Sequence, residues 1–404
     1  MDLNIKTKLA SGYRNVEGGL FSAVTKADVG DGFASMQEKV TLMGWADPFY
    51  PDPSLPEHVM SAMMENLKRG FLAHYTMPIG SLELRQAIAR KIKNFNHIET
   101  DPKRNIMVTP GSDSGLYFSM SLFINPGDEV LVPDPSYPNN FLNTTLLGGK
   151  IVPFPLLADD HFQINIPGLE KLITPKTKML VLTHPNNPTS TVFRKENLVA
   201  LSEFIISHDL ILVVDQAFED LVFDDIEFVS PASLPGMWER TVTIFSISKG
   251  MGLSGLRVGY ILAHERIMDV FYGSAVNVVG ATNTLSQLGA IAALENDAFI
   301  AGYRTIFNSR RKLTFDILSQ VPGVRMALPE SGFFSWLDVS ALGDSTEVMK
   351  YLIREARVAV NDGKNYGSLG NGWIRIVHGC LADDQEAMDS IKRVAAALKK
   401  FPHK

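Results

Sequence analysis

Short apolar runs alternate with amphipathic stretches through the first two thirds of the chain. Several of these runs lack polar alternation, which is typical of strands covered on both faces of a parallel sheet. The strands predicted in this way are 105–109, 129–133, 178–183, 210–214, 241–245 and 259–263. Helical periodicity between them predicts helices that include 82–95, 112–123 and 195–208. Strands that alternate with helices predict an α/β fold with a mostly parallel sheet, in which ligands bind beyond the carboxyl ends of the strands.

The pattern changes after about residue 285, where long helical patterns dominate. The helices predicted there are 285–294, 300–320, 346–357 and 384–400, with β-like stretches at 333–338 and 373–377. The first 45 residues have weak periodicity and predict an arm that packs on this part. We therefore expect an N-terminal arm with part of a small domain (1–45), a large domain (46–285) and a smaller C-terminal α+β domain (286–404).

Composition narrows the function classes. The chain has 404 residues, of which 45% are apolar and 20% charged, as in ordinary globular proteins of this length. The net charge of −6 has no long runs, which argues against a nucleic-acid or membrane partner. Cys380 is the only cysteine, so no disulfide forms within the chain, and a reducing compartment is expected. With no apolar run of spanning length and no signal-peptide core, the sequence predicts a soluble cytoplasmic protein.

One lysine directly follows a predicted strand, beside two serines, in the stretch Ser246-Ile-Ser248-Lys249, and Arg257 comes eight residues later. The apolar strand predicts a partly buried amine, which tends to lose its proton and can attack an aldehyde. The serines and Arg257 can hold a phosphate. An aldehyde and a phosphate on one small molecule indicate pyridoxal 5'-phosphate (PLP). Taken alone, the pattern also fits a lysine that closes a surface strand before a glycine-rich turn.

Three further motifs follow predicted strands. Ser112 and Asp113 begin a helix after a glycine, and the free N–H groups of a helix start form an anion site. Asn187 lies in a proline-rich turn, from which its amide can donate to a ring oxygen. Asp215 ends an apolar strand, where a carboxylate is costly to bury unless it meets a cation such as a protonated pyridine. Each motif alone also fits a structural role, as a helix cap or an Asx turn.

Arg375 alternates with apolar neighbours in a predicted strand, and its fork suits a substrate carboxylate. A structural salt bridge would account equally well for this arginine by itself. Together, however, the lysine, the pyridine partner, the ring-oxygen donor, the phosphate site and the carboxylate fork are what one adduct of PLP and an amino acid requires.

On these motifs the chain resembles the class I/II aminotransferases of PLP fold type I, which are aspartate aminotransferase-like, over nearly its whole length. The specific motifs are that of Lys249, the triplet Asn187-Pro188-Thr189, and the stretch 75–89, which begins at Tyr75 and contains Gly80 and Leu84-Arg85. The resemblance implies a large domain with a mostly parallel, seven-stranded-type sheet and a smaller α+β domain.

The same resemblance implies a role for each motif residue. Lys249 is the catalytic residue and forms the Schiff base with PLP, Asp215 pairs with the pyridine nitrogen, Asn187 contacts the ring hydroxyl, and Tyr137 stacks on the ring. The phosphate is held by Ser112, Asp113, Ser246, Ser248 and Arg257. Arg375 binds the substrate α-carboxylate, with Asn187 and Ala46 beside it, and no metal is implied. Tyr75 reaches the phosphate of a neighbouring subunit, which implies a homodimer with shared active sites.

Three positions depart from the family pattern. Phe218, which faces the cofactor by the resemblance, replaces the usual tyrosine and removes one donor to the ring oxygen. Ala46 replaces a glycine whose backbone contacts the substrate carboxylate, and Ser190 replaces the glycine after Asn187-Pro-Thr.

We therefore predict a PLP-dependent aminotransferase that moves an amino group between an L-amino acid and a 2-oxo acid. The alternative is a PLP-dependent lyase acting at Cβ, such as a carbon–sulfur lyase, because the stretch 45–47 loosely resembles that group. The two differ in product: a lyase releases pyruvate and ammonia without an added acceptor. A third interpretation, a PLP-sensing transcription regulator, requires a DNA-binding module, and the residues before Tyr75 carry no basic helix-turn-helix. Which amino acid is the substrate does not follow from these motifs, since Arg375 meets only the carboxylate common to all of them.

Overall fold

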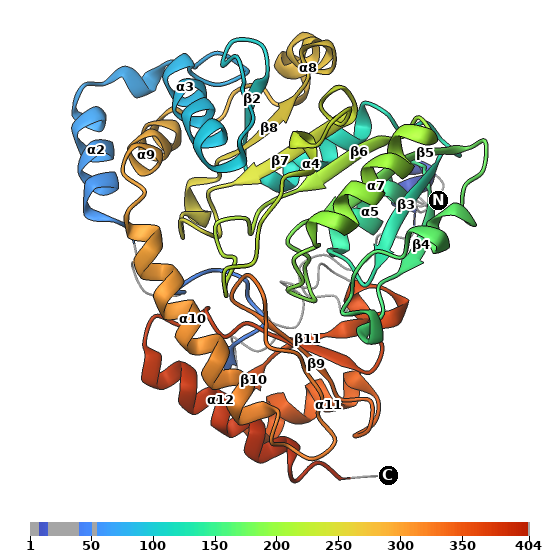
Figure 1. Ribbon diagram of the computed structural model, residues 1–404. Coiled ribbons are helices and arrows are strands. Elements are labelled where there is room, and N and C mark those ends of the chain that lie inside the picture. Colours follow the sequence, from blue (N-terminus) through green and yellow to red (C-terminus); the bar gives the residue numbers. More distant parts are fainter. Residues whose placement is uncertain (1–7, 15–39, 51–54, 403–404) are drawn as a thin grey trace, which may run out of the picture.

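The computed structural model describes residues 8–14, 40–50 and 55–402 (Figure 1). A unit built on one large sheet lies above a smaller unit formed mainly by the C-terminal part of the chain. The predicted arm falls largely on residues 1–7 and 15–39, which lie outside the described residues. The predicted domain boundaries stay predictions.

The large sheet has seven strands in the order β2-β8-β7-β6-β5-β3-β4. All neighbouring strands are parallel except at β8, which is antiparallel to both β2 and β7. This arrangement confirms the predicted α/β fold with a mostly parallel sheet. The strands are β2 (Ile106–Thr109), β3 (Glu129–Asp134), β4 (Lys150–Pro155), β5 (Thr177–Thr183), β6 (Ile211–Asp215), β7 (Thr241–Ser246) and β8 (Gly259–Ala263).

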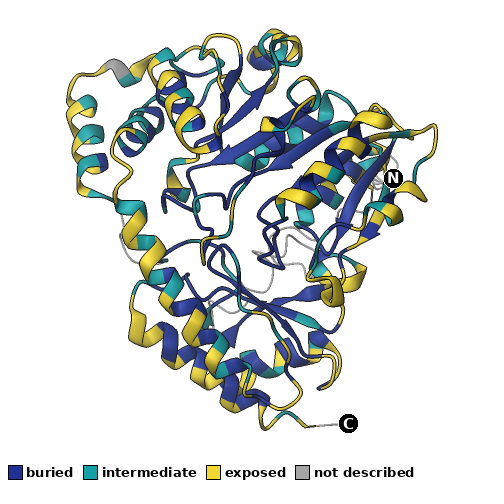
Figure 2. Ribbon diagram, viewed as in Figure 1, coloured by how far each residue is buried: buried dark blue, intermediate teal, exposed yellow. Residues whose placement is uncertain are grey.

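Apolar side chains on both faces explain why the central strands read as continuous apolar runs. In β5, Val181 joins the core cluster that contains residues of α4 (Ser112–Ser121) and α8 (Glu265–Val278). Leu180 and Leu182 join the cluster that contains residues of α7 (Lys195–Ser207). Successive side chains of a strand point to opposite faces, so each face has its own core. The central strands are accordingly buried along most of their length (Figure 2).

The helices around this sheet are α2 (Glu57–Lys68), α3 (Leu82–Lys91), α4 (Ser112–Ser121), α5 (Pro138–Leu146), α6 (Ile166–Glu170), α7 (Lys195–Ser207), α8 (Glu265–Val278) and α9 (Thr284–Glu295). The periodicity found α3, α4, α7 and α9 but missed α2, α5, α6 and α8. It also missed β4, whose sequence contains two prolines. β4 is an edge strand, and an edge is where a strand tolerates proline, because one side of its backbone needs no partner.

The smaller unit contains an antiparallel sheet in the order β11-β12-β9. Its strands are β9 (Ser335–Asp338), β11 (Asn361–Asp362) and β12 (Trp373–Ile376), and its helices are α10 (Phe299–Leu318), α11 (Ser345–Tyr351) and α12 (Asp384–Leu398). Near the start of the chain, β1 (Thr41–Leu42) pairs in parallel with β10 (Val358–Ala359). The segment that follows β1 is thereby brought from the smaller unit toward the carboxyl ends of the large sheet.

Candidate active site

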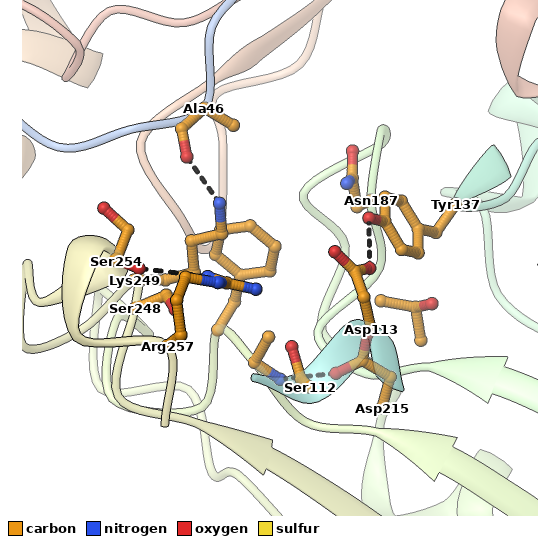
Figure 3. A pocket seen from close by; sticks show the side chains of 13 residues that line it. Ala46, Ser112, Asp113, Tyr137, Asn187, Asp215, Ser248, Lys249, Ser254 and Arg257 are labelled. Carbon is orange, nitrogen blue, oxygen red and sulfur yellow. Dashed lines mark hydrogen bonds between the residues drawn. The ribbon is translucent and has the colours of Figure 1, made fainter. Parts of the chain in front are cut away.

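A cavity of about 100 Å³ opens beyond the carboxyl ends of β5, β6 and β7 (Figure 3). It is lined by Ala46, Ser112, Asp113, Tyr137, Thr183, Asn187, Asp215, Ala217, Phe218, Ser248, Lys249, Ser254 and Arg257. Ten of these thirteen residues are predicted site residues, and the structure brings them together from six separate segments. Thr183, Ala217 and Ser254 are the additional ones. Thr183 ends a predicted strand, and Ala217 and Ser254 lie within the motifs of Asp215 and Lys249. Their positions in the sequence could therefore have indicated them.

Lys249 extends from the loop after β7 across the cavity. Its Nζ donates a 2.5 Å hydrogen bond to the carbonyl oxygen of Ala46, in the segment that follows β1 (Figure 3). Ser246 does not line the cavity, because its hydroxyl turns back and accepts a 3.1 Å hydrogen bond from the N–H of Ser248. Ser254 donates to the carboxylate of Asp47 and so ties the same loop to the same segment.

The start of α4 has a geometry that suits an anion. Gly111 has a φ of +86°, and a Cβ there would lie 2.3 Å from Nη2 of Arg257. Gly259 brings β8 equally close, since a Cβ on it would lie 2.6 Å from the backbone nitrogen of Ser112. The first N–H groups of a helix have no intrahelical partner and carry a partial positive charge. The two glycines therefore let a guanidinium lie directly beside these N–H groups.

Two carboxylates, those of Asp113 and Asp215, line the cavity and have different partners. The Asp113 carboxylate accepts hydrogen bonds from the hydroxyl of Tyr137 at 2.8 Å and from the amide of Asn139 at 2.7 Å. It thus orients the Tyr137 ring, and any contact of Asp113 with an anion falls to its backbone N–H. Asp215 is buried at the end of β6, and its Oδ1 accepts from the N–H of Ala217 at 3.1 Å.

Arg375 is fully buried on β12, next to the cavity. Its Nη1 donates to Oδ1 of Asn187 at 2.9 Å, and its Nε and Nη2 donate to Oδ1 of Asn361 at 3.1 and 2.8 Å. Nη2 also lies 3.2 Å from the carbonyl oxygen of Gly44. These hydrogen bonds fix the orientation of the guanidinium. Asn361 lies on the neighbouring strand β11, and no feature of the sequence indicated it.

Three other residues noted in the sequence, namely Phe218, Ser190 and Tyr75, differ in their surroundings. Phe218 lines the cavity and packs edge-on against Phe334, with ring centroids 5.1 Å apart. Ser190 has a φ of +61°, a region that favours glycine, which agrees with the glycine expected there. Tyr75 does not line the cavity and is 97% exposed.

His184 lies directly after β5, at the start of the turn that carries Asn187. Its ring stacks on Phe228 and Phe193, with centroids 4.8 and 5.4 Å away, and burial lowers the pKa of His184 to about 3. The ring is therefore neutral at ordinary pH and acts as an apolar support for the turn.

Comparison with known proteins decides the family. The family model described as aminotransferase class I and II matches residues 40–392. The chain belongs to this family. It is 34% identical to an aspartate aminotransferase of Pyrococcus abyssi and 33% identical to an aromatic-amino-acid aminotransferase of Thermococcus litoralis, in each case over 86% of this chain and 90% of the relative. A solved aromatic aminotransferase from Pyrococcus horikoshii superposes with a TM-score of 0.85 at 32% identity, over 91% of this chain and 98% of that chain.

The aminotransferase fold is thus the predicted PLP fold type I. The relatives carry names of aminotransferases or transaminases, which favours the predicted transferase over the lyase alternative. In the described ranges, no helix is long and apolar enough to cross a membrane. Over the same ranges, no cluster of three or more His, Cys, Asp or Glu side chains is arranged to hold a metal ion.

Proposed function

We propose that the cavity binds PLP and that this aminotransferase converts an L-amino acid and a 2-oxo acid into the exchanged pair. The observation that carries the proposal is that Lys249, Asp215 and the anion site of Arg257 and α4 face one cavity. They suit the aldehyde, the ring nitrogen and the phosphate of PLP, respectively. Bound there, PLP supplies an aldehyde that joins amines and a ring that accepts electrons from the substrate Cα.

The phosphate would be held by the N–H groups of Ser112 and Asp113, by the hydroxyl of Ser248 and by Arg257. Ser246 would act through its hydrogen bond to Ser248. Tyr137, oriented by Asp113, would cover one face of the ring, and Phe218 and the amide of Asn187 would lie at its edge. Asp215 would keep a proton on the ring nitrogen, because a buried carboxylate stabilises a neighbouring cation.

The amine of Lys249 would move the proton from the substrate Cα, first as a base and then as an acid. Ala46 would hold that amine between turnovers through the hydrogen bond to its carbonyl. Arg375 would bind the substrate α-carboxylate bidentately, as guanidinium forks do. The surrounding buried side chains would exclude water and so strengthen that charge pair. The relatives are named as aminotransferases of aspartate and of aromatic amino acids and as an arginine–pyruvate transaminase, so they share an amino acid as substrate but differ in its side chain.

We also propose a cytoplasmic homodimer with shared sites. Tyr75 is almost fully exposed, and further large apolar side chains are exposed in the same part of the chain, namely Met60, Met64, Leu67 and Met77. Several exposed apolar side chains in one part of the chain suit a partner subunit. The single buried cysteine, which forms no disulfide within the chain, supports a reducing compartment.

Borohydride reduction of the holoenzyme tests the central assignment. It should attach the cofactor to one peptide, the one containing Lys249, as read by mass spectrometry. Lys249→Ala should still bind PLP through the phosphate contacts but should lose turnover by several orders of magnitude. Lys91 is the matched control, since it is also a largely buried amine and desolvation lowers its pKa, yet it lies outside the cavity. Labelling of Lys91 in place of Lys249 would refute the proposal.

A further inference from the structure

One carboxylate at the end of the large sheet binds a loop of the smaller unit. Asp134 is the last residue of β3 and is 4% exposed. Its Oδ2 accepts hydrogen bonds from the N–H of Ser368 at 2.9 Å and from its hydroxyl at 2.7 Å. Its Oδ1 accepts from the N–H of Leu369 at 3.0 Å. A carboxylate with three donors of this kind makes charge-assisted bonds, which are stronger than bonds between neutral groups.

The loop is shaped for this contact. Gly367 has a φ of +125°, and a Cβ on it would lie 2.2 Å from Oδ1 of Asp134, so a side chain there would displace the carboxylate. On the other side of Gly367, the carbonyl oxygen of Tyr366 accepts a 2.8 Å hydrogen bond from the N–H of Ser136. The segment 134–136 therefore holds the loop on both sides of the glycine.

This loop carries Tyr366, whose ring contacts the guanidinium of Arg375. Tyr366 is fully buried, and its ring centroid lies 5.0 Å from the guanidinium carbon of Arg375. The ring also packs against Trp336, with centroids 5.7 Å apart, and Trp336 is the residue opposite Arg375 in the sheet register. One wall of the space around Arg375 is thus placed by a loop that Asp134 holds. Next in the chain after the segment 134–136 comes Tyr137, which lines the cavity.

We propose that Asp134 is a positioning residue that couples the loop 366–369, and through Tyr366 the Arg375 fork, to the segment carrying Tyr137. It touches neither cofactor nor substrate. Its contribution is to hold the guanidinium at a set distance from the cavity, so that the α-carboxylate and the reacting Cα are held together. The proposal rests on the assignment of Arg375 to the substrate carboxylate.

Asp134→Asn tests the proposal, since the amide keeps the size but turns one acceptor into a donor that faces the N–H groups of the loop. For the amino acid that reacts fastest in a panel, KM should rise about tenfold, the effect of one charge-assisted hydrogen bond, while kcat changes by less than about twofold. The amine that lacks the carboxylate of that amino acid should react as with the unsubstituted enzyme. Hydrogen exchange should speed up at the amides of Ser368 and Leu369, a readout independent of activity.

Glu129→Gln is the matched control. Glu129 begins the same strand, is also 4% exposed, and accepts hydrogen bonds from Lys150 and Thr174 far from the cavity. The substitution Glu129→Gln should lower the free energy of unfolding without changing KM or the hydrogen exchange of the amides of Ser368 and Leu369. Equal changes in KM for Asp134→Asn and Glu129→Gln would overturn the proposal. Equal losses of activity of Asp134→Asn toward the amino acid and toward the amine would also overturn it.

The substitution Arg375→Ala separates the positioning role of Asp134 from the assignment of Arg375 to the substrate carboxylate. If it discriminates between amino acid and amine but Asp134→Asn does not, the positioning role of Asp134 fails and the proposed function stands. If Arg375→Ala itself shows no discrimination, the carboxylate fork is wrongly assigned, and the proposal fails with it.

Discussion

At the scale of single residues, the proposed role of Arg375 in binding the substrate carboxylate can be tested most directly. The hydrogen bonds of Arg375 to Asn187, Asn361 and Gly44 fix the orientation of the guanidinium. Truncating one partner of a buried charge pair costs about 2–5 kcal/mol, so Arg375→Ala should weaken binding of amino acids by roughly 30-fold or more. Steady-state kinetics should show this loss, and the visible spectrum of the bound cofactor should barely change.

Asn361→Ala should weaken the binding of amino acids less than Arg375→Ala does, because it removes only a side chain that orients the guanidinium. A loss as large as that of Arg375→Ala would contradict this distinction between aiming and binding.

Two buried histidines should make folding sensitive to acid. Burial lowers the pKa of His184 to about 3, and burial together with the charges of Arg310 and Arg311 lowers the pKa of His378 to about 3. The unfolded chain binds a proton on each below its ordinary pKa of about 6.5, whereas the folded chain does not. Above that pH the free energy of unfolding is therefore at its full value. As the pH falls from about 7 to about 5, it decreases by about 2 kcal/mol per histidine.

Urea denaturation at these two pH values measures the effect. His184→Gln and His378→Gln should each reduce the pH-dependent loss by about 2 kcal/mol, whatever they do to stability at neutral pH. His161→Gln, at an exposed position, serves as the control and should keep the full pH dependence. If all three variants lost stability in parallel with the unsubstituted protein, acid sensitivity would arise elsewhere.

At the scale of elements, the proposed phosphate site depends on how closely β8 approaches the start of α4. Gly259→Ala would place a Cβ 2.6 Å from the nitrogen of Ser112 and 2.9 Å from the carbonyl oxygen of Phe245, so the strand and helix must move apart. Overpacking of this kind costs typically about 1–3 kcal/mol. The affinity for PLP should fall by a factor of roughly ten or more, measured by fluorescence titration of the apoenzyme.

Gly255→Ala is the control for this substitution. Gly255 lies in the neighbouring 3₁₀ helix Ser254–Leu256, and a Cβ there would meet no atom within 4 Å. It should leave the affinity for PLP unchanged. Equal effects of the two substitutions would argue that general loosening of the loop, and not the approach of β8 to α4, sets the affinity.

At the scale of the whole molecule, the exposed Tyr75 predicts that each site is completed by a second subunit. Mixing Lys249→Ala subunits with Tyr75→Ala subunits should produce hybrid dimers in which one site carries both defects and the other neither. Activity should therefore recover in part, up to a quarter of the normal value for random exchange of equal amounts. Native mass spectrometry should establish the hybrid. A hybrid without recovered activity would place the action of Tyr75 within its own subunit or remove it from the site.

The sequence by itself determined the strands of the sheet centre and the chemistry placed at their ends. A strand buried on both faces must be apolar throughout, so β5, β6 and β7 are visible as runs, and a polar residue that ends such a run is conspicuous. Lys249, Asp215 and Asn187 were found for this reason, and the structure places all three at one cavity. The edge strand β4, with its prolines, carries no such constraint and was not found.

Only the tertiary structure decided which distant residues support these groups. The hydrogen bond from Arg375 to Asn187 spans 188 positions of the chain, and the bond from Leu369 to Asp134 spans 235. An asparagine or aspartate in a polar loop looks the same in the sequence whether it faces water or aims a guanidinium, because its local periodicity is unaffected by a partner that lies far along the chain. Contacts of this range depend on the order of the strands and on how the smaller unit lies against the sheet, and neither is encoded in a local pattern.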